Sequence, residues 1–289
     1  MNIRIPDRAV VVGVDGSSHA DEALAWAAAE ADRSDRPLVI AHATGHHRDH
    51  ATLGGPTLQE RRILGRRLVD RALARIWNRF PGLPVQTLVR AVDPVDLMHE
   101  AGSVAALLVV GSRGLGPVSS AVLGSVSGAV AADAPCPVVV VRGRVRDGAV
   151  EQVVAATDLT DTGEPVRAFA RDRASVAGAR LTLVHSWRAG AGDPPHDRLT
   201  DVVQQCLAED PTLAVETELT HEAAGRAVVA ASHRAALVVV GHSVEHVRPV
   251  SFRGESVASY VVARAGCPVA VVPTYAGVPG AADRRTVDA

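Results

Sequence analysis

A glycine- and serine-rich stretch after a buried apolar run is the part of the sequence best suited to bind a ligand. The run Ala105–Val110 leads into Gly111-x2-Gly114-x9-Gly124-Ser125. Glycines allow left-handed backbone conformations and a close approach to an anion. The serines that follow predict a helix start, where unpaired N–H groups and the positive end of the helix dipole favour phosphate. The pattern indicates nucleotide or phosphate binding, although a turn that only joins a strand to a helix would have a similar composition.

The residue types that are missing narrow this chemistry. All 30 residues counted as Lys or Arg are arginine, so the chain has no lysine. A Walker A loop needs a lysine on the β- and γ-phosphates, which excludes a P-loop NTPase. The stretch also differs from the G-x-G-x-x-G dinucleotide fingerprint, which follows the first strand of its domain.

The composition predicts an α/β protein with two domains and no membrane or nucleic-acid partner. A chain of 289 residues is long for one core, and 47% hydrophobic but only 3% aromatic residues suit parallel sheets covered by helices. The net charge of -2 and the lack of a long basic run argue against nucleic-acid binding. No apolar run approaches the ~18 residues of a membrane span, and no signal-peptide pattern opens the chain. Three separated cysteines do not form a disulfide framework, so we expect a cytoplasmic protein.

Four apolar stretches recur in the same order in the two halves of the chain. The pairs are Val10–Asp15 with Val153–Asp158, Leu38–Ala43 with Leu181–Ser186, Ala106–Gly111 with Ala236–Gly241, and Cys136–Val141 with Cys267–Val272. Such a repeat predicts two copies of one domain. We expect these copies over residues 1–145 and 150–275, followed by a disordered tail over 276–289.

Within each copy, apolar strands alternate with helical segments. The apolar residues from Ala20 to Ala31 recur with a helical period, and Ser17 or Ser18 is the expected N-cap. A long polar helix is expected over residues 58–80. This alternation predicts a parallel, doubly wound sheet in each copy.

Three candidate residues end predicted strands. Ligands of doubly wound sheets bind at the carboxyl ends of the strands. Asp15, Ala43 and Gly111 are predicted to lie at such ends. A further helix, opened by Asp93 and Pro94, follows the predicted strand over 85–89.

These residues resemble the signature of the universal stress protein family in its tandem, two-domain form. The family pattern G-x2-G-x9-G-[ST] is met by Gly111, Gly114, Gly124 and Ser125. The opening V-G-V-D-G-S from Val12, the pair His42-Ala43 and the pair Cys136-Pro137 are also similar to the family. The resemblance covers nearly the whole chain. The lysine-free composition, rich in Ala, Val and Arg, suggests a high-GC bacterial source, actinobacterial-like.

The resemblance implies a fold and a function. The fold would be two tandem Rossmann-like domains of the adenine nucleotide alpha hydrolase-like class, each with a five-stranded parallel sheet of order 3-2-1-4-5. The last strands, Pro137–Val141 and Pro268–Val272, would pair to form an internal pseudo-dimer. The function would be that of a regulatory stress-response module that binds ATP, with Mg²⁺ accompanying the triphosphate. A homodimer of tandem chains is also implied.

The resemblance assigns the ATP site to the first copy. Asp15 would contact the nucleoside, the backbone of Ala43 would meet adenine, and the glycine-rich stretch would hold ribose and phosphates. The full set of expected contact residues is Gly13, Asp15, Ala43, Gly111, Arg113, Gly114, Gly116, Gly124, Ser125, Val126 and Ser127.

The second copy departs from the signature. Val244 stands where the second glycine is expected after Gly241, and Glu255 follows Gly254 in place of a serine. A shifted alignment makes Ser256 the serine but places Glu255 on the third glycine. A β-branched residue in a glycine conformation costs about 1–2 kcal/mol. The second site is therefore expected to bind ATP weakly or not at all, and its remaining candidates are Asp158, Ser186, Gly241, Gly254 and Ser256.

Three functions remain open at this point: a regulatory ATP-binding protein, a slow ATPase or nucleotidyl-transfer enzyme, and a nucleotide-free interaction module. No catalytic residue is predicted, and the segment from Asp15 to Ser18 lacks the Ser-Gly-Gly loop of a nucleotidyl-transfer enzyme. No metal site is predicted either, because the histidines near the second strand fall in an expected solvated loop. These are His42, His46, His47 and His50. Cys136 and Cys267 are expected to be small buried hydrophobes, and Cys206 is expected to lie on a helix.

Overall fold

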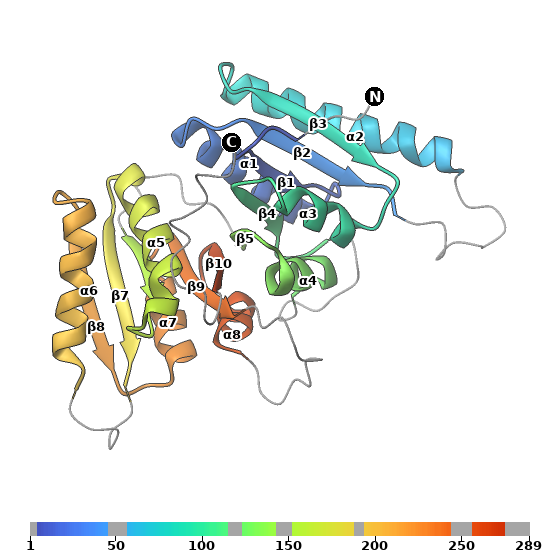
Figure 1. Ribbon diagram of the computed structural model, residues 1–289. Coiled ribbons are helices and arrows are strands. Elements are labelled where there is room, and N and C mark those ends of the chain that lie inside the picture. The colour runs from blue at the N-terminus through green and yellow to red at the C-terminus, as the bar shows by residue number, and fades with distance from the viewer. Residues whose placement is uncertain are drawn as a thin grey trace, which may run out of the picture.

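The strands of both halves of the chain join into a single ten-stranded sheet (Figure 1). The computed structural model describes residues 5–45, 57–114, 123–142, 152–187, 194–243 and 256–274. The first half contains β1 (Val10–Gly13), α1 (Ser18–Arg33), β2 (Leu38–Ala43), α2 (Leu58–Arg79), β3 (Val85–Arg90), α3 (Pro94–Gly102), β4 (Leu107–Gly111), α4 (Ser125–Asp133) and β5 (Val138–Val141). The second half contains β6 (Gln152–Ala156), the 3-10 helix η2 (Asp161–Gly163), α5 (Glu164–Ala177), β7 (Arg180–Ser186), α6 (His196–Glu209), β8 (Val215–Thr220), α7 (Ala224–Ser232), β9 (Leu237–Ser243), α8 (Val257–Arg264) and β10 (Val269–Thr274).

The strand order is that of a doubly wound sheet used twice. It runs β3-β2-β1-β4-β5 and continues β10-β9-β6-β7-β8, so each half has the order 3-2-1-4-5 implied by the family resemblance. Neighbouring strands within each half are parallel. The last strands β5 and β10 pair antiparallel, with Val140 opposite Val269 and Val138 opposite Val271. The predicted pairing of the last strands is confirmed, and Figure 1 shows β5 and β10 between the two halves.

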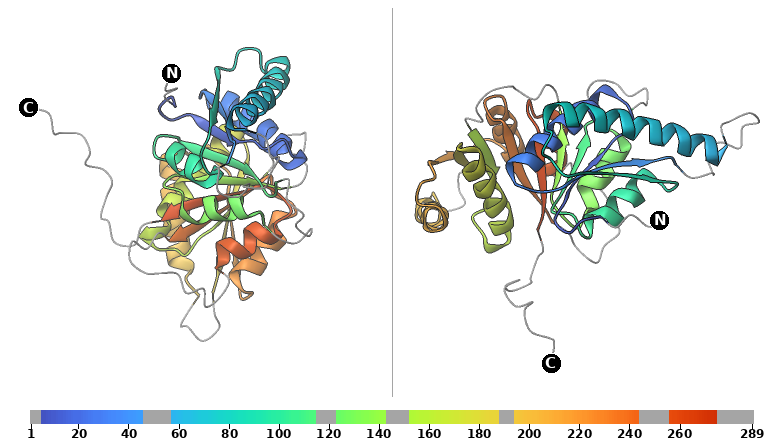
Figure 2. Two further views of the ribbon diagram at one scale, coloured as in Figure 1. Left: turned by 90° about the vertical axis from the view of Figure 1, so that its right-hand side faces the viewer. Right: turned by 90° about the horizontal axis from the view of Figure 1, so that it is seen from above.

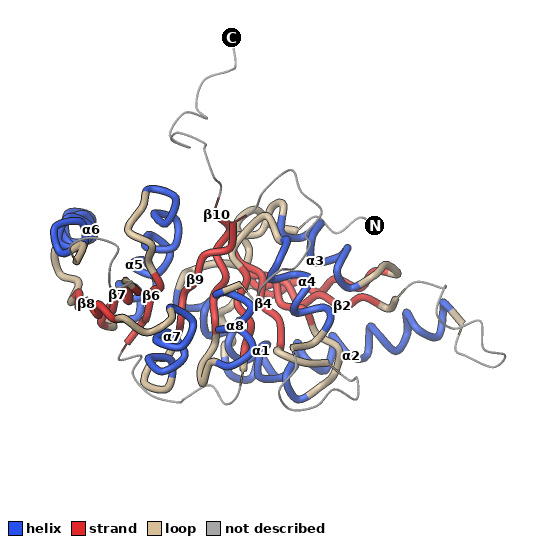
Figure 3. Tube along the Cα trace, turned by 90° about the horizontal axis from the view of Figure 1, so that it is seen from below, coloured by secondary structure: helices blue, strands red, loops and turns tan. Residues whose placement is uncertain are grey.

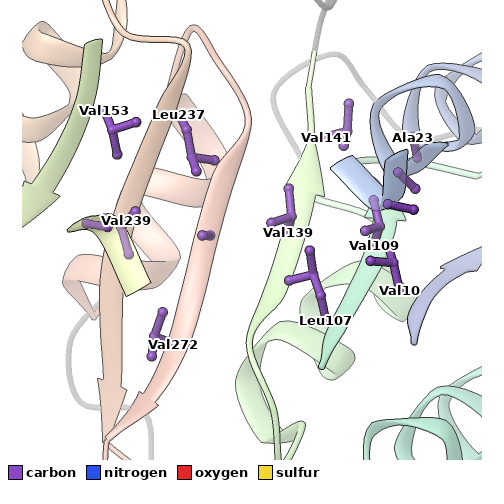
Figure 4. Close-up of a cluster of buried hydrophobic side chains, with 14 of the residues drawn as sticks. Val10, Ala23, Leu107, Val109, Val139, Val141, Val153, Leu237, Val239 and Val272 are labelled. Atoms are coloured by element: carbon purple, nitrogen blue, oxygen red, sulfur yellow. The ribbon is translucent and has the colours of Figure 1, made fainter. Parts of the chain in front are cut away.

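Helices cover both faces of the sheet because its strands are apolar on both sides. In β1, Val10 and Val12 belong to one buried cluster and Val11 to the other, as the alternation along a strand requires. The first cluster lies under α1, α2, α5 and α6, and the second lies under α3, α4, α7 and α8. Figure 3 shows the strands as a layer between helices, and Figure 4 shows side chains of the first cluster from both halves, including Val139 and Val272.

The predicted helices form with cap residues that the sequence supplies. Ser17 is the N-cap of α1 and accepts a hydrogen bond from the Ala20 amide at 3.2 Å, and the apolar stripe of this helix is buried. The helix α2 begins after Thr57, which forms a capping box with Glu60. It ends one residue short of the expected boundary, and Figure 2 shows it extending along the outside of the first half.

The three cysteines are buried, as expected for Cys136 and Cys267, and Cys206 lies in the helix α6. Cys136, Cys206 and Cys267 carry free thiols. Burial raises the pKa of the Cys136 thiol to about 12, so this thiol stays protonated at neutral pH. These thiols behave as small apolar groups of the core.

Two polar contacts join the halves beside the β5–β10 pair. Arg173 of α5 forms an ion pair with Glu30 of α1, whose side chain is 3% exposed. Arg142, next to β5, donates a hydrogen bond to the carbonyl of Val262 in α8. The segment 143–151, which joins the two copies, and the predicted tail over 276–289 lie outside the described residues. In the described ranges no helix is both long and apolar enough to cross a membrane.

Candidate functional site

The residues predicted for the first site surround one cavity at the carboxyl ends of β1, β2 and β4. The cavity has a volume of about 290 Å³. All of the predicted residues except Gly116 line it, and Gly116 lies outside the described residues. Those that line it are Gly13, Asp15, Ala43, Gly111, Arg113, Gly114, Gly124, Ser125, Val126 and Ser127.

Gly114 lies directly against the carboxylate of Asp15. A Cβ atom at position 114 would stand 2.5 Å from Asp15 Oδ2, closer than two non-bonded atoms approach. The other oxygen, Oδ1, accepts a hydrogen bond from the Ser17 amide at 2.9 Å. The segment after β4 therefore reaches the start of α1 only because residue 114 has no side chain.

Gly111, at the end of β4, has a similar steric role. A Cβ atom at this position would lie 2.7 Å from the backbone carbonyl of His19 in the first turn of α1. The strand β4 and the helix α1 therefore pack backbone against backbone at the rim of the cavity.

The helix α4 begins at the cavity without a capping side chain. Its N-cap is Gly124, no side chain in the described residues bonds the first-turn amides, and the first turn has no acidic residue. Ser125, Val126 and Ser127 of this turn line the cavity. Unpaired amides and the positive end of the helix dipole favour an anion at this position.

Ser127 holds the helix start in place. Its side chain is 3% exposed, and its Oγ lies 3.2 Å from the Ser112 carbonyl oxygen and 3.0 Å from that of Gly124. The Gly124 amide also donates to the Ser112 carbonyl at 2.9 Å. The hydroxyl proton of Ser127 is directed at backbone carbonyls, so this residue positions the start of α4 beside the end of β4.

The histidine at the end of β2 is fixed by a backbone hydrogen bond. His42 Nδ1 lies 2.7 Å from the Val14 carbonyl oxygen, so Nδ1 carries the proton that is donated. His185 Nδ1 lies at the same distance, 2.7 Å, from the Thr157 carbonyl oxygen in the second half. The bond orients the ring beside the backbone of Ala43, the position expected to meet adenine.

The apolar wall of the cavity was not predicted from the sequence. Pro94, Leu97 and Met98 of α3 line it, and the last two are almost fully buried. Their spacing of i, i+3 and i+4 places them on one face of α3. That spacing was a readable signal, because the predicted strand order carries this helix across β1. The cavity thus combines an apolar wall with a polar rim at α4, an arrangement suited to a flat heterocycle that carries an anionic group.

Comparisons with known proteins match the chain to one family. The sequence profile of the universal stress protein family matches residues 8–142. A universal stress protein of Thermus aquaticus is 38% identical over 137 residues, which cover 47% of this chain and 98% of that protein. The chain belongs to the universal stress protein family. A universal stress protein of Mycobacterium tuberculosis is 32% identical over 190 residues, which span 62% of this chain and 63% of that protein's length.

The likeness to solved structures extends over both halves of this universal stress protein. The crystal structure of a universal stress protein from Archaeoglobus fulgidus matches with a TM-score of 0.72, over 93% of this chain and 99% of that chain, at 16% identity. At this identity the match shows a shared fold.

In the second half the aspartate at the end of the first strand is held by its own loop. Asp158 Oδ1 accepts hydrogen bonds from the amide and the hydroxyl of Thr160 at 2.9 and 2.8 Å. A Cβ atom at Gly163 would lie 2.4 Å from the same oxygen. The carboxylate therefore packs against the loop before α5, whereas Asp15 packs against Gly114 of the segment after β4.

The strand that precedes the glycine-rich segment also differs between the two halves. The strand β9 continues past Gly241 to Ser243, which pairs with Thr274 of β10. By contrast, β4 ends at Gly111. The chain of the second half runs straight on where that of the first half turns toward Asp15.

The remaining candidates of the second site are engaged in local structure or lie outside the described residues. Ser256 is the N-cap of α8 and accepts a hydrogen bond from the Ser259 amide at 3.1 Å, so this helix start is capped, unlike that of α4. The Ser186 hydroxyl donates to the Glu222 carbonyl at 2.5 Å. Outside the described residues lie Gly254, Val244, Glu255, His46, His47 and His50.

Proposed function

We propose that the first half binds ATP at the cavity beside α4 and that the protein is a regulatory nucleotide-binding module of the stress response. The observation that carries the proposal is the uncapped start of α4 at a cavity whose other wall is apolar. Phosphate would lie at this helix start, and the adenine ring would lie against Leu97 and Met98 of α3.

In this proposal, different residues of the cavity bind different parts of the ligand. Asp15 is a hydrogen-bond acceptor for the ribose hydroxyls, and the backbone of Ala43 recognises the edge of adenine. Gly114, Gly124 and Ser125 surround the phosphates. Each charge-assisted hydrogen bond to phosphate contributes about 1.5–3 kcal/mol, so three or four such bonds are enough for micromolar affinity. Mg²⁺ would bind with the triphosphate and neutralise part of its charge.

The second half is proposed to have lost this function. Its helix start is capped by Ser256, and β9 runs on past Gly241. In the first half the corresponding helix start is uncapped and lies at the cavity, and β4 ends at Gly111.

The proposal is tested by denaturing freshly purified protein and measuring the released nucleotide by chromatography. We expect about one ATP per chain. Gly114→Val should lower the amount of bound nucleotide at least tenfold, because any side chain at 114 meets Asp15. Gly82→Val is the matched control, since no atom lies within 4 Å of a Cβ there.

The other outcomes separate the alternatives. Two nucleotides per chain would contradict a lost second site. No nucleotide, and no binding when Mg-ATP is added, would favour the interaction module, and release of ADP from added ATP would favour the slow ATPase. The homodimer of tandem chains and the cytoplasmic location belong to the same proposal, and light scattering of the purified chain tests the dimer.

A further inference from the structure

A second cavity lies between α2 and the end of β2, on the other side of His42 from the cavity beside α4. Its volume is about 820 Å³, and it shares His42 and Ala43 with the first cavity. We propose that this second cavity binds the phosphate groups of a small molecule, independently of the nucleotide site. The groups that would recognise the ligand are Thr44, Arg61, Arg67 and Arg71.

The helix that forms the cavity carries a concentrated positive charge. The helix α2 contains seven arginines and only two acidic residues, Glu60 and Asp70. By contrast, the whole chain has a net charge of -2. The corresponding helix of the second half, α6, has one arginine and three acidic residues. The positive charge is therefore a property of this helix and not of the repeated fold.

The arginines of the cavity are not neutralised by described carboxylates. In the described residues, Arg75 of the same helix pairs with Asp21, whereas no ion pair joins Arg61, Arg67 or Arg71 to an acidic group. Asp70 is the single carboxylate in the cavity lining. Three guanidinium groups against one carboxylate leave an excess of positive charge that a phosphate dianion would balance.

Two buried polar atoms at the cavity have no hydrogen-bond partner in the described part of the chain. They are Arg61 Nε and Thr44 Oγ1. Buried polar atoms are almost always paired in native proteins, so an unpaired donor beside a cavity points to an absent ligand. Both groups can donate to a phosphate oxygen, which ties the proposal to an acceptor-rich anion.

The position of these two atoms favours a small ligand over a macromolecule. Both atoms are buried and belong to residues that line the cavity, whereas the surface of a macromolecule would also meet Arg62 and Arg66, which lie outside the cavity lining. The wall toward the first cavity is close-packed, because a Cβ atom at Gly65 would lie 2.8 Å from His42 Cδ2. His42, which lines both cavities, therefore packs against α2.

The test titrates inorganic pyrophosphate by calorimetry into the full chain carrying Gly114→Val, which removes the proposed nucleotide site. We expect one pyrophosphate per chain. Arg67→Gln with Arg71→Gln should weaken binding at least tenfold. Arg62→Gln with Arg66→Gln removes the same charge from the same helix outside the cavity and should change affinity less than threefold. All four arginines are exposed, so the fold should survive both pairs.

An equal loss of pyrophosphate affinity in both double variants would overturn the proposal, because it would show that pyrophosphate is attracted to the whole helix and not to the cavity. Absence of pyrophosphate binding, or equal binding of citrate, would overturn it as well. The two pairs are also compared in the unaltered chain, so a folding defect of Gly114→Val does not decide the result. The amount of co-purified ATP should be the same in both pairs, which separates this proposal from the nucleotide site.

A conservative change tests the buried hydroxyl. Thr44→Val keeps the shape of the side chain and should weaken pyrophosphate binding several-fold. It should leave the melting temperature unchanged or higher, because it removes a buried polar atom that has no described partner. A lower melting temperature with unchanged affinity would show that the hydroxyl is structural, and would contradict its role in the cavity.

Discussion

Gly16 and Leu159 occupy matching places after the first strand of each half, and both have a left-handed backbone. Their φ angles are 87° and 60°. Glycine adopts this conformation without a steric penalty, whereas leucine does not. Leu159 is only 8% exposed, so burial of its side chain offsets the backbone strain in the second half. The first half has no such compensation and depends on glycine.

This difference predicts the effect of a small substitution. Gly16→Ala should lower the free energy of unfolding by about 1–2 kcal/mol, because alanine resists the left-handed conformation. A Cβ atom at 16 would also stand 3.2 Å from Leu68 Cδ1. Denaturant unfolding of the full chain measures the change, with Gly82→Ala as the control. Equal stability of the two variants would contradict the argument.

At the residue scale, the glycine spacing and the strand ends predicted where Asp15, Ala43 and Gly114 would meet. The reason for a glycine here is steric, since Gly114 contacts Asp15 so closely that only glycine fits. Ser127 lies at the cavity as predicted, but its hydroxyl bonds backbone carbonyls. Hydrogen-bond directions of this kind depend on loop geometry that residue spacing does not specify.

At the scale of elements, three helices differ in how the backbone amides of their first turn are capped. The start of α2 has a capping box, α8 has a serine cap, and α4 has neither. Of these three helix starts, that of α4 lies at the cavity beside β4. A free helix start at a cavity is thus the structural counterpart of the sequence signature.

The capping box of α2 predicts a pH dependence. Hydrogen bonds from the Thr57 amide and hydroxyl lower the pKa of the Glu60 carboxyl below its usual value. The box therefore stabilises α2 above the unfolded-state pKa of about 4.3. This contribution disappears as the pH falls through the lower, folded-state pKa.

NMR titration of the Glu60 side chain measures this pKa. Thr57→Ala should move it back toward the usual value, since the hydroxyl bond is lost, and Thr57→Ser should keep it low. The same pKa in all three proteins would show that the hydroxyl bond does not stabilise the carboxylate.

The periodicity of the sequence predicted the helices and strands well, but it did not predict which helix faces would line a cavity. The apolar stripe of α1 and the boundaries of α2 followed from local sequence. The apolar wall contributed by α3 depends on how a crossover helix is placed, which is a long-range property. The charge of α2 was overlooked because the total charge of the chain is close to neutral.

At the scale of the whole molecule, a buried ion pair holds α1 against α5. Glu30 contacts both Arg173 across the halves and Arg33 in its own helix, the latter at 2.8 Å. Burial lowers the pKa of the Arg173 guanidinium.

Removing that partner should destabilise the joined halves. Glu30→Gln leaves the buried guanidinium of Arg173 without its carboxylate and should cost about 3 kcal/mol of unfolding free energy. Asp32→Asn, a matched change at an exposed position of the same helix, should cost less than about 0.5 kcal/mol. Chemical denaturation distinguishes the two, and a similar small loss in both would mean that the pair is not needed.

The antiparallel contact of β5 with β10 reverses the direction of the strands at the middle of the sheet. The carboxyl ends of the two sets of parallel strands therefore lie at opposite ends of the sheet. A ligand at the carboxyl ends of the first set and one at the carboxyl ends of the second set would not touch each other. Substitutions at one of these two surfaces are therefore expected to leave the contacts of the other unchanged.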